Sequence, residues 1–157
     1  VQAEEKARRA GEGSAEVLAQ LHKVPGCEAL TWDDVQIAST IFAVKPGDGS
    51  AREQAASCQR VLGAGANIVT EYATKRYRSN LINWGMLPLQ LVGATPFGLG
   101  DYVFIPNIRE ALKGDLQDIK AYVLGDTAKE FSLYMAPLTA DERKILADGC
   151  LINFYKN

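Results

Sequence analysis

The sequence predicts an α/β fold with a mixed sheet flanked by helices. The chain has 157 residues, of which 47% are hydrophobic and 23% charged, a size and composition typical of one globular domain with its own core. Runs rich in β-branched residues alternate with stretches of helical spacing. The later runs are linked by short turns, which favours a sheet that contains both parallel and antiparallel pairs.

Residues 1–24 are predicted to be a linker or a loosely packed N-terminal helix. They are rich in Ala, Glu, Lys and Arg and are interrupted by Gly11-Glu12-Gly13, although residues 14–22 have helical spacing. The domain itself is expected to span residues 25–157. Because the sequence begins with Val1 rather than Met, we expect a processed start or a piece of a longer chain.

Turn residues set the bounds of the elements that follow. Lys45-Pro46-Gly47 ends the first expected strand, and Gly63-Ala64-Gly65 ends the next helix. Pro88 indicates an edge strand or the start of a strand. Thr139 and Glu142 form the sequence pattern of a capping box at the start of the last helix. The expected strands are residues 35–44, 66–71, 87–92, 102–105, 119–124 and 131–134, and the expected helices are residues 51–62, 74–84 and 139–147.

Charge and cysteine content exclude several classes of function. The net charge of −2 argues against a general nucleic-acid or anionic-membrane surface, and no apolar run approaches the roughly 20 residues that span a bilayer. The three cysteines, Cys27, Cys58 and Cys150, are far apart, which is typical of free thiols in a reducing compartment and predicts a cytoplasmic protein. Their spacing does not suit a zinc or iron–sulfur site.

The segment Gly47-Asp48-Gly49-Ser50-Ala51-Arg52-Glu53 allows two interpretations. In the first, Ser50 is the N-cap of a helix and Glu53 completes a capping box. In the second, the helix N-terminus binds a carboxylate, Arg52 grips it with two hydrogen bonds, and Gly49 lets the backbone approach the ligand. The two interpretations are compatible, because one serine can cap the free helix and act on a substrate.

Three blocks together resemble the aconitase superfamily. Residues 47–55 resemble its motif G-E-G-S-S-R-E-H-A, residues 80–89 resemble N-L-x-x-x-G-L-L-P-L, and residues 138–150 are similar to its final helix and "AG" turn. The blocks occur in the family's order and spacing. Two departures from the first motif matter: the second Ser is Ala51, and the His is Gln54. The family's further upstream Arg has no evident counterpart.

The resemblance implies a swivelling β/β/α domain that closes over a [4Fe–4S] cluster held by larger cluster-bearing domains, in the same chain or in a separate subunit. It implies a hydro-lyase that acts on a small hydroxy-carboxylic acid, with Ser50 as the base, Arg52 as the carboxylate binder and Gly49 as a further substrate contact. No cluster ligand is expected in this chain, so it should be inactive alone. No nucleic-acid or membrane partner is expected.

Two alternatives stay open at this point. In a close variant, the chain is the small subunit of an isopropylmalate or homoaconitate isomerase, although the charged N-terminal segment and the missing initiator Met favour a domain of a larger chain. It is also compatible with a non-catalytic binding module that kept the fold, because Ala51 and Gln54 depart from the motif.

Overall fold

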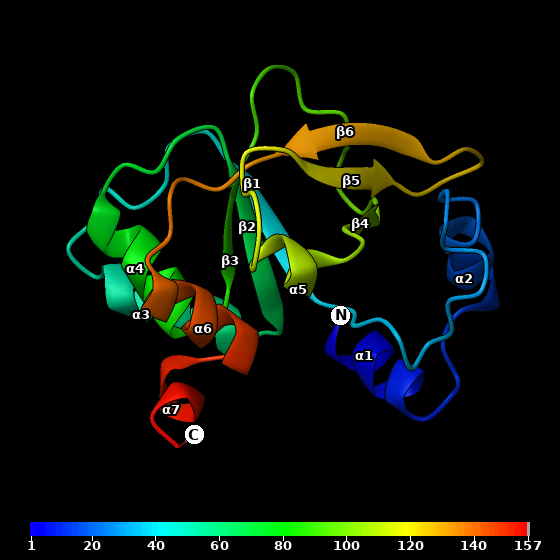
Figure 1. Cartoon of the computed structure of the whole chain (residues 1–157), viewed down its shortest axis with the longest axis horizontal. Coiled ribbons are helices and arrows are strands. Elements are labelled where there is room, and N and C mark those ends of the chain that lie inside the picture. Colours follow the sequence, from blue (N-terminus) through cyan, green and yellow to red (C-terminus); the bar gives the residue numbers. More distant parts are fainter. Residues whose placement is uncertain (157) are drawn as a thin grey trace.

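The first half of the chain forms a parallel sheet because a helix between each two successive strands returns the chain to the end of the sheet where the strands begin (Figure 1). In the computed structural model, which describes residues 1–156, strands β1, β2 and β3 lie side by side in that order. Helices α3 and α4 connect them. The bounds are β1 Ser39–Ala43, α3 Arg52–Val61, β2 Ala64–Val69, α4 Lys75–Asn83 and β3 Leu87–Gln90.

The second half forms an antiparallel sheet in the order β4-β5-β6, with α6 and α7 after it. A single antiparallel bridge between Gln90 and Tyr134 connects the two sheets. The α/β class is therefore confirmed, whereas the expected mixed sheet is divided into one parallel and one antiparallel sheet. The bounds are β4 Val103–Phe104, α5 Ile108–Ala111, β5 Ile119–Val123, β6 Lys129–Leu133, α6 Ala140–Asp148 and α7 Leu151–Phe154.

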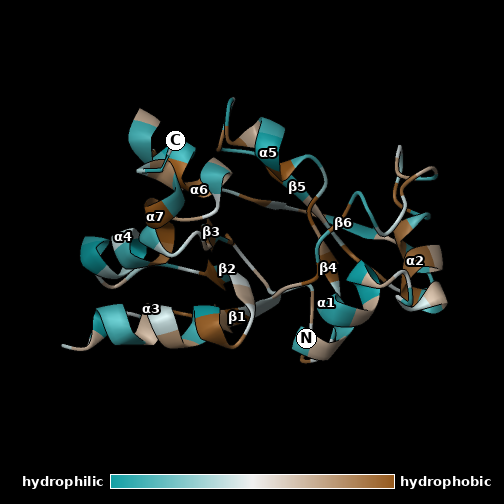
Figure 2. Cartoon of the chain, turned by 90° about the horizontal axis from the view of Figure 1, so that it is seen from below, coloured by the Kyte–Doolittle hydropathy of each residue, from teal (hydrophilic) through white to brown (hydrophobic). Residues whose placement is uncertain are grey.

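The main hydrophobic core lies between the two sheets and extends to α4 and α6. The strands carry the hydrophobic colours at the centre of the molecule, between helices with more hydrophilic outer faces (Figure 2). Strands of both sheets therefore bury apolar side chains in this shared core. Core side chains from these elements include Ile68, Ile82, Leu89, Ile119, Leu133, Ile145 and Leu146.

The N-terminal segment contains two helices, α1 (Gln2–Arg9) and α2 (Ala15–Leu21), at the opposite end of the molecule from α6 and α7 (Figure 1). The Glu5 carboxylate of α1 accepts a hydrogen bond from the Ile37 N–H at 2.9 Å. After α2, Val24 and Cys27 pack against Tyr122 of β5. These contacts attach the segment to the rest of the fold, and the domain boundary at residue 24 stays a prediction.

The expected elements recur with small changes in their bounds. Helices α4 and α6 begin after Thr74 and Thr139, and the predicted capping box of α6 is confirmed. Strand β1 begins at Ser39 rather than at residue 35, because the backbone at Ile37 is bound to Glu5 instead of to a neighbouring strand. Within residues 1–156, no helix is long and apolar enough to cross a bilayer.

Candidate functional site

The loop between β1 and α3 is held in place by the residues that precede α4. The Gly47 carbonyl accepts a hydrogen bond from the Thr74 hydroxyl at 3.2 Å, and the Pro46 carbonyl accepts one from the Ala73 N–H at 3.0 Å. Thr74 also caps α4. The motif loop and the start of α4 are therefore a single hydrogen-bonded unit.

The two motif glycines have different structural roles. Gly47 has a φ of 99°, and a Cβ placed on it would lie 2.6 Å from the Cβ of Tyr77. Only glycine therefore allows the loop to rest on the Tyr77 side chain. Among residues 1–156, no atom lies within 4 Å of the corresponding position of Gly49, so its missing side chain leaves open space beside the loop.

The predicted capping of α3 is wrong. The N-cap residue is Ala51, and no side chain within residues 1–156 caps the helix. The Glu53 carboxylate instead accepts a hydrogen bond at 2.9 Å from the indole N–H of Trp84, at the end of α4. The N–H groups of the first turn of α3 are consequently left without a side-chain acceptor, and Ser50 is exposed.

The motif borders a cleft of about 410 Å³. Its walls come from β1, the motif loop, the first two turns of α3, and α4. Two of the three predicted site residues, Gly49 and Arg52, line the cleft. The third, Ser50, is exposed and is not among the residues that line it. The lining residues are Ile41, Pro46, Gly47, Asp48, Gly49, Ala51, Arg52, Ala55, Gln59 and Tyr77.

Arg52 has a side-chain nitrogen without a hydrogen-bond partner among residues 1–156. Its Nε is buried and has no hydrogen-bond partner within residues 1–156. A buried donor left unpaired is costly, so an arginine kept in this position is suited to an acceptor that arrives with a ligand. The guanidinium offers a planar pair of donors to such an acceptor.

A polar network beneath the cleft was not predicted from the sequence. The Tyr77 hydroxyl accepts hydrogen bonds from the side-chain amides of Gln59 and Asn67, each at 3.0 Å. Asn67 is fully buried in β2, and Tyr72 lies 6.2 Å from Tyr77 between ring centroids. Burial, with a smaller effect from Tyr77, raises the pKa of Tyr72, which keeps that hydroxyl protonated. The one available signal was an Asn within the apolar run of β2.

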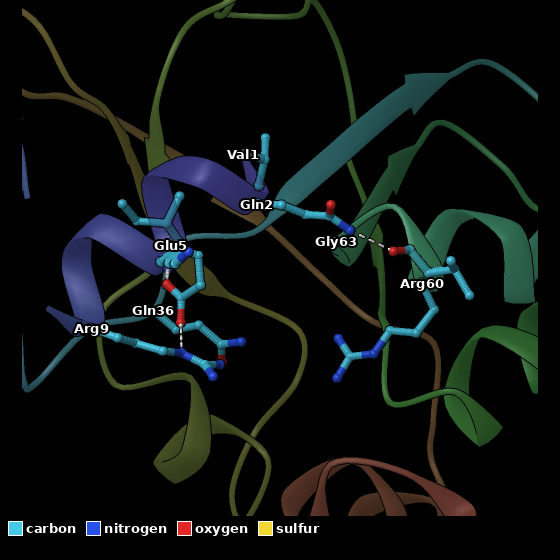
Figure 3. Close-up of a pocket in the computed structure, with 10 residues that line it drawn as sticks. Val1, Gln2, Glu5, Arg9, Gln36, Arg60 and Gly63 are labelled. Atoms are coloured by element: carbon cyan, nitrogen blue, oxygen red, sulfur yellow. Dashed lines mark hydrogen bonds and ion pairs between the residues drawn. The ribbon is translucent and has the colours of Figure 1, made fainter.

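A second cleft, of about 400 Å³, lies between α1 and the end of α3 (Figure 3). Four of its polar side chains, those of Gln2, Glu5, Arg9 and Arg60, already have partners within the chain. Glu5 pairs with Arg9 at 2.9 Å, Gln2 donates to the Val61 carbonyl, and Arg60 donates to the Ala64 carbonyl. The motif cleft, with its unpaired Arg52 Nε, is therefore the candidate site.

The described residues do not fit a metal cluster. Cys27 is buried against the α2 end of the molecule, Cys58 is exposed on α3, and Cys150 follows α6. Among residues 1–156, no group of three His, Cys, Asp or Glu side chains is placed to hold a metal ion. A cluster that worked with this site would need ligands from outside the described residues.

Comparison with known proteins identifies the family of this chain. The family model of the aconitase C-terminal domain matches residues 18–93, a range that contains the motif loop, α3 and α4. Over 116 residues, or 69% of this chain, the sequence is 34% identical to aconitate hydratase A of Mycobacterium avium. The matched region is 12% of the length of that relative. The chain therefore belongs to the aconitase family, to which it is related through the C-terminal domain.

Proposed function

We propose that this chain serves as the C-terminal domain of an aconitase-type hydro-lyase or isomerase that acts on a small hydroxy-carboxylic acid. In this proposal Arg52 binds a substrate carboxylate, Ser50 is the catalytic base, and Gly49 lets the substrate approach the loop. The observation that carries it is the buried, unpaired Nε of Arg52 in a cleft formed by the family motif.

The start of α3 supports binding of an anion. Because Ala51 offers no cap, the N–H groups of the first turn remain available, and the helix terminus carries partial positive charge. Arg52, the first residue of α3, adds a full positive charge at the same end. A carboxylate held there would satisfy groups that the protein leaves unpaired.

The chemistry assigned to Ser50 is removal of a carbon-bound proton. The deprotonated serine oxygen takes up the proton, and the C–H electron pair forms the new double bond. The hydroxyl leaves the neighbouring carbon with its bonding pair as hydroxide, for which a cluster on the partner domains would supply a Lewis acid. A serine hydroxyl is a weak base in water, so its deprotonated form needs stabilisation. Ser50 stands two residues before Arg52 and next to the uncapped helix terminus, which would favour a negative oxygen.

The [4Fe–4S] cluster and the large domains belong to the proposal as partners rather than to this chain. The relative is far longer than the matched region, which leaves room for cluster-bearing domains elsewhere in that protein. Since the described residues supply no cluster site, we infer that this chain is inactive alone. A cytoplasmic location is proposed on the basis of its three free cysteines.

Ala51 and Gln54 bear on the choice of substrate. Where the family motif has a second serine, Ala51 presents a methyl group to the cleft. A site without one hydroxyl contact binds a ligand that needs that hydrogen bond less well. We therefore propose that the substrate differs from the usual one of the family, or binds more weakly.

A non-catalytic binding module is the second candidate. It is favoured by the exposure of Ser50 and by its position outside the residues that line the cleft. In this alternative Arg52 would still bind a carboxylate, but no proton transfer would follow.

Activity of the complete protein that carries this domain separates the two. Ser50→Ala is compared with Ser57→Ala, a matched control on α3 whose hydroxyl donates to the Gln54 carbonyl at 3.1 Å. Citrate, aconitate and isopropylmalate serve as trial substrates. The hydro-lyase proposal predicts that Ser50→Ala lowers kcat by at least about 1,000-fold, while Ser57→Ala changes it less than about threefold. Equal, small effects of both changes would favour the binding module.

A further inference from the structure

We propose that Gln59 is a specificity-determining residue of the Arg52 cleft, and that it recognises an uncharged hydroxyl on the arm of the bound acid. This inference rests on the proposed role of Arg52 as the carboxylate binder and adds the chemistry of the rest of the ligand. It does not depend on Ser50 as a base.

The position of Gln59 follows from the geometry of α3. Ala51, Ala55 and Gln59 recur every four residues, so they lie on one face of the helix, and all three line the cleft. Arg52 and Gln59 are seven residues apart, which corresponds to roughly 10 Å along the helix axis. The cleft therefore has a cationic group near one end and an amide two turns away.

The surface between these two groups is mostly apolar. Ile41, Ala51 and Ala55 line it with aliphatic side chains, which suits a hydrocarbon arm.

Gln59 has one paired and one unpaired polar atom. Its Nε2 donates to the Tyr77 hydroxyl, and its Oε1 is buried without a partner within residues 1–156. The same Tyr77 hydroxyl is held from β2 by Asn67, which is fully buried. The amide is thus fixed on one side only, and one of its two polar atoms remains unsatisfied whichever of them faces Tyr77.

A ligand hydroxyl matches this unsatisfied atom in either case, because a hydroxyl both donates and accepts hydrogen bonds. An alkyl group would leave the buried atom unpaired, at a cost of about 1–3 kcal/mol. The site should therefore prefer a hydroxylated acid to the same acid without the hydroxyl. The difference in affinity between the two acids should correspond to the free energy of one hydrogen bond.

The test measures the affinity of the 157-residue chain for hexanoate and for 6-hydroxyhexanoate by NMR titration. We expect the hydroxy acid to bind roughly 3- to 10-fold more tightly. Gln59→Met should remove this preference while leaving the affinity for hexanoate within about twofold. Gln20→Met, the same change on α2 away from the cleft, should retain the preference.

A second readout needs no variant. In the unmodified chain, 6-hydroxyhexanoate should shift the side-chain amide resonances of Gln59, whereas hexanoate should leave them nearly unchanged. This measurement decides the case even if Gln59→Met fails to fold.

The outcomes separate the two proposals. If Arg52→Gln weakens the binding of hexanoate, the role of Arg52 stands. The role of Gln59 is overturned if the chain then shows no preference for the hydroxy acid, or if that preference survives Gln59→Met. Binding of neither acid, or binding that Arg52→Gln does not weaken, overturns both roles.

Discussion

Replacing Gly47 by alanine should displace the whole candidate site. Gly47 adopts a φ of 99°, which side chains other than glycine rarely adopt. A new methyl group would lie 2.6 Å from the Tyr77 Cβ and 2.7 Å from its ring. Neither atom can move freely, since Tyr77 is buried in α4 and its hydroxyl holds Gln59 and Asn67.

The expected cost has two parts. Forcing alanine into the left-handed region costs about 1–2 kcal/mol, and overpacking a buried contact costs about 1–3 kcal/mol. Gly47→Ala should therefore lower the free energy of unfolding by about 2–5 kcal/mol. For a domain of this size, that corresponds to a fall in Tm of roughly 4–20 °C.

Gly49→Ala is the matched control, because Gly49 has no atom within 4 Å of a new Cβ and its φ is not in the left-handed range. Urea denaturation of both variants measures the difference, with an expected change below about 0.5 kcal/mol for Gly49→Ala. Carboxylate titration of the folded Gly49 variant then reports on access to the loop. Equal stability of the two variants would refute the contact between the loop and Tyr77.

Three further predictions concern stability. Gly85→Ala should cost about 3 kcal/mol or more, measured by urea denaturation, because Gly85 has a φ of 73° and a new Cβ would collide with a carbonyl at the end of α6. Hydrogen bonds, chiefly from Arg8, lower the pKa of Glu5 from 4.5 to about 2. The ionised Glu5 therefore adds roughly 1–2 kcal/mol to the free energy of unfolding above pH 4.5, and this contribution is lost as the pH falls to 2. Denaturation curves across that range should show a flatter pH dependence for Glu5→Gln. Thr139→Ala should cost about 1 kcal/mol because it removes a cap, whereas Ser50→Ala, which removes none, should change Tm by less than about 2 °C.

The sequence predicted most elements of the fold because their signals are local. The capping pair at Thr139 and the turn at Gly85 act over a few residues, and the structure has helix ends at both. The division into two sheets could not be read from the sequence, because it depends on which distant strands pair. The short helices α5 and α7 were also missed, whereas a helix at α1 was one of the two alternatives predicted for the N-terminal segment. The four-residue α5 and α7 carry too few residues for a periodic pattern.

The candidate site was predicted where its residues are adjacent in the chain. Gly49 and Arg52 were identified from the motif, and both line the cleft. Gln59, Tyr77 and Asn67 were not, since they come from three different elements and meet only after the fold forms. A network of this kind leaves no fixed spacing in the sequence.

The absence of the predicted Ser50 cap at the start of α3 affects what the site can do chemically. A serine that capped the helix would have its oxygen occupied by a backbone N–H, and a ligand would have to compete for both groups. Here Trp84 takes the carboxylate of Glu53, Ala51 occupies the N-cap position, and Ser50 lies outside the helix. The oxygen of Ser50 and the donors of the first turn can therefore act on a ligand without first breaking a cap. In this chain the motif residue Glu53 therefore connects α3 to α4, and it does not compete for Ser50 and Arg52 in the roles proposed for them.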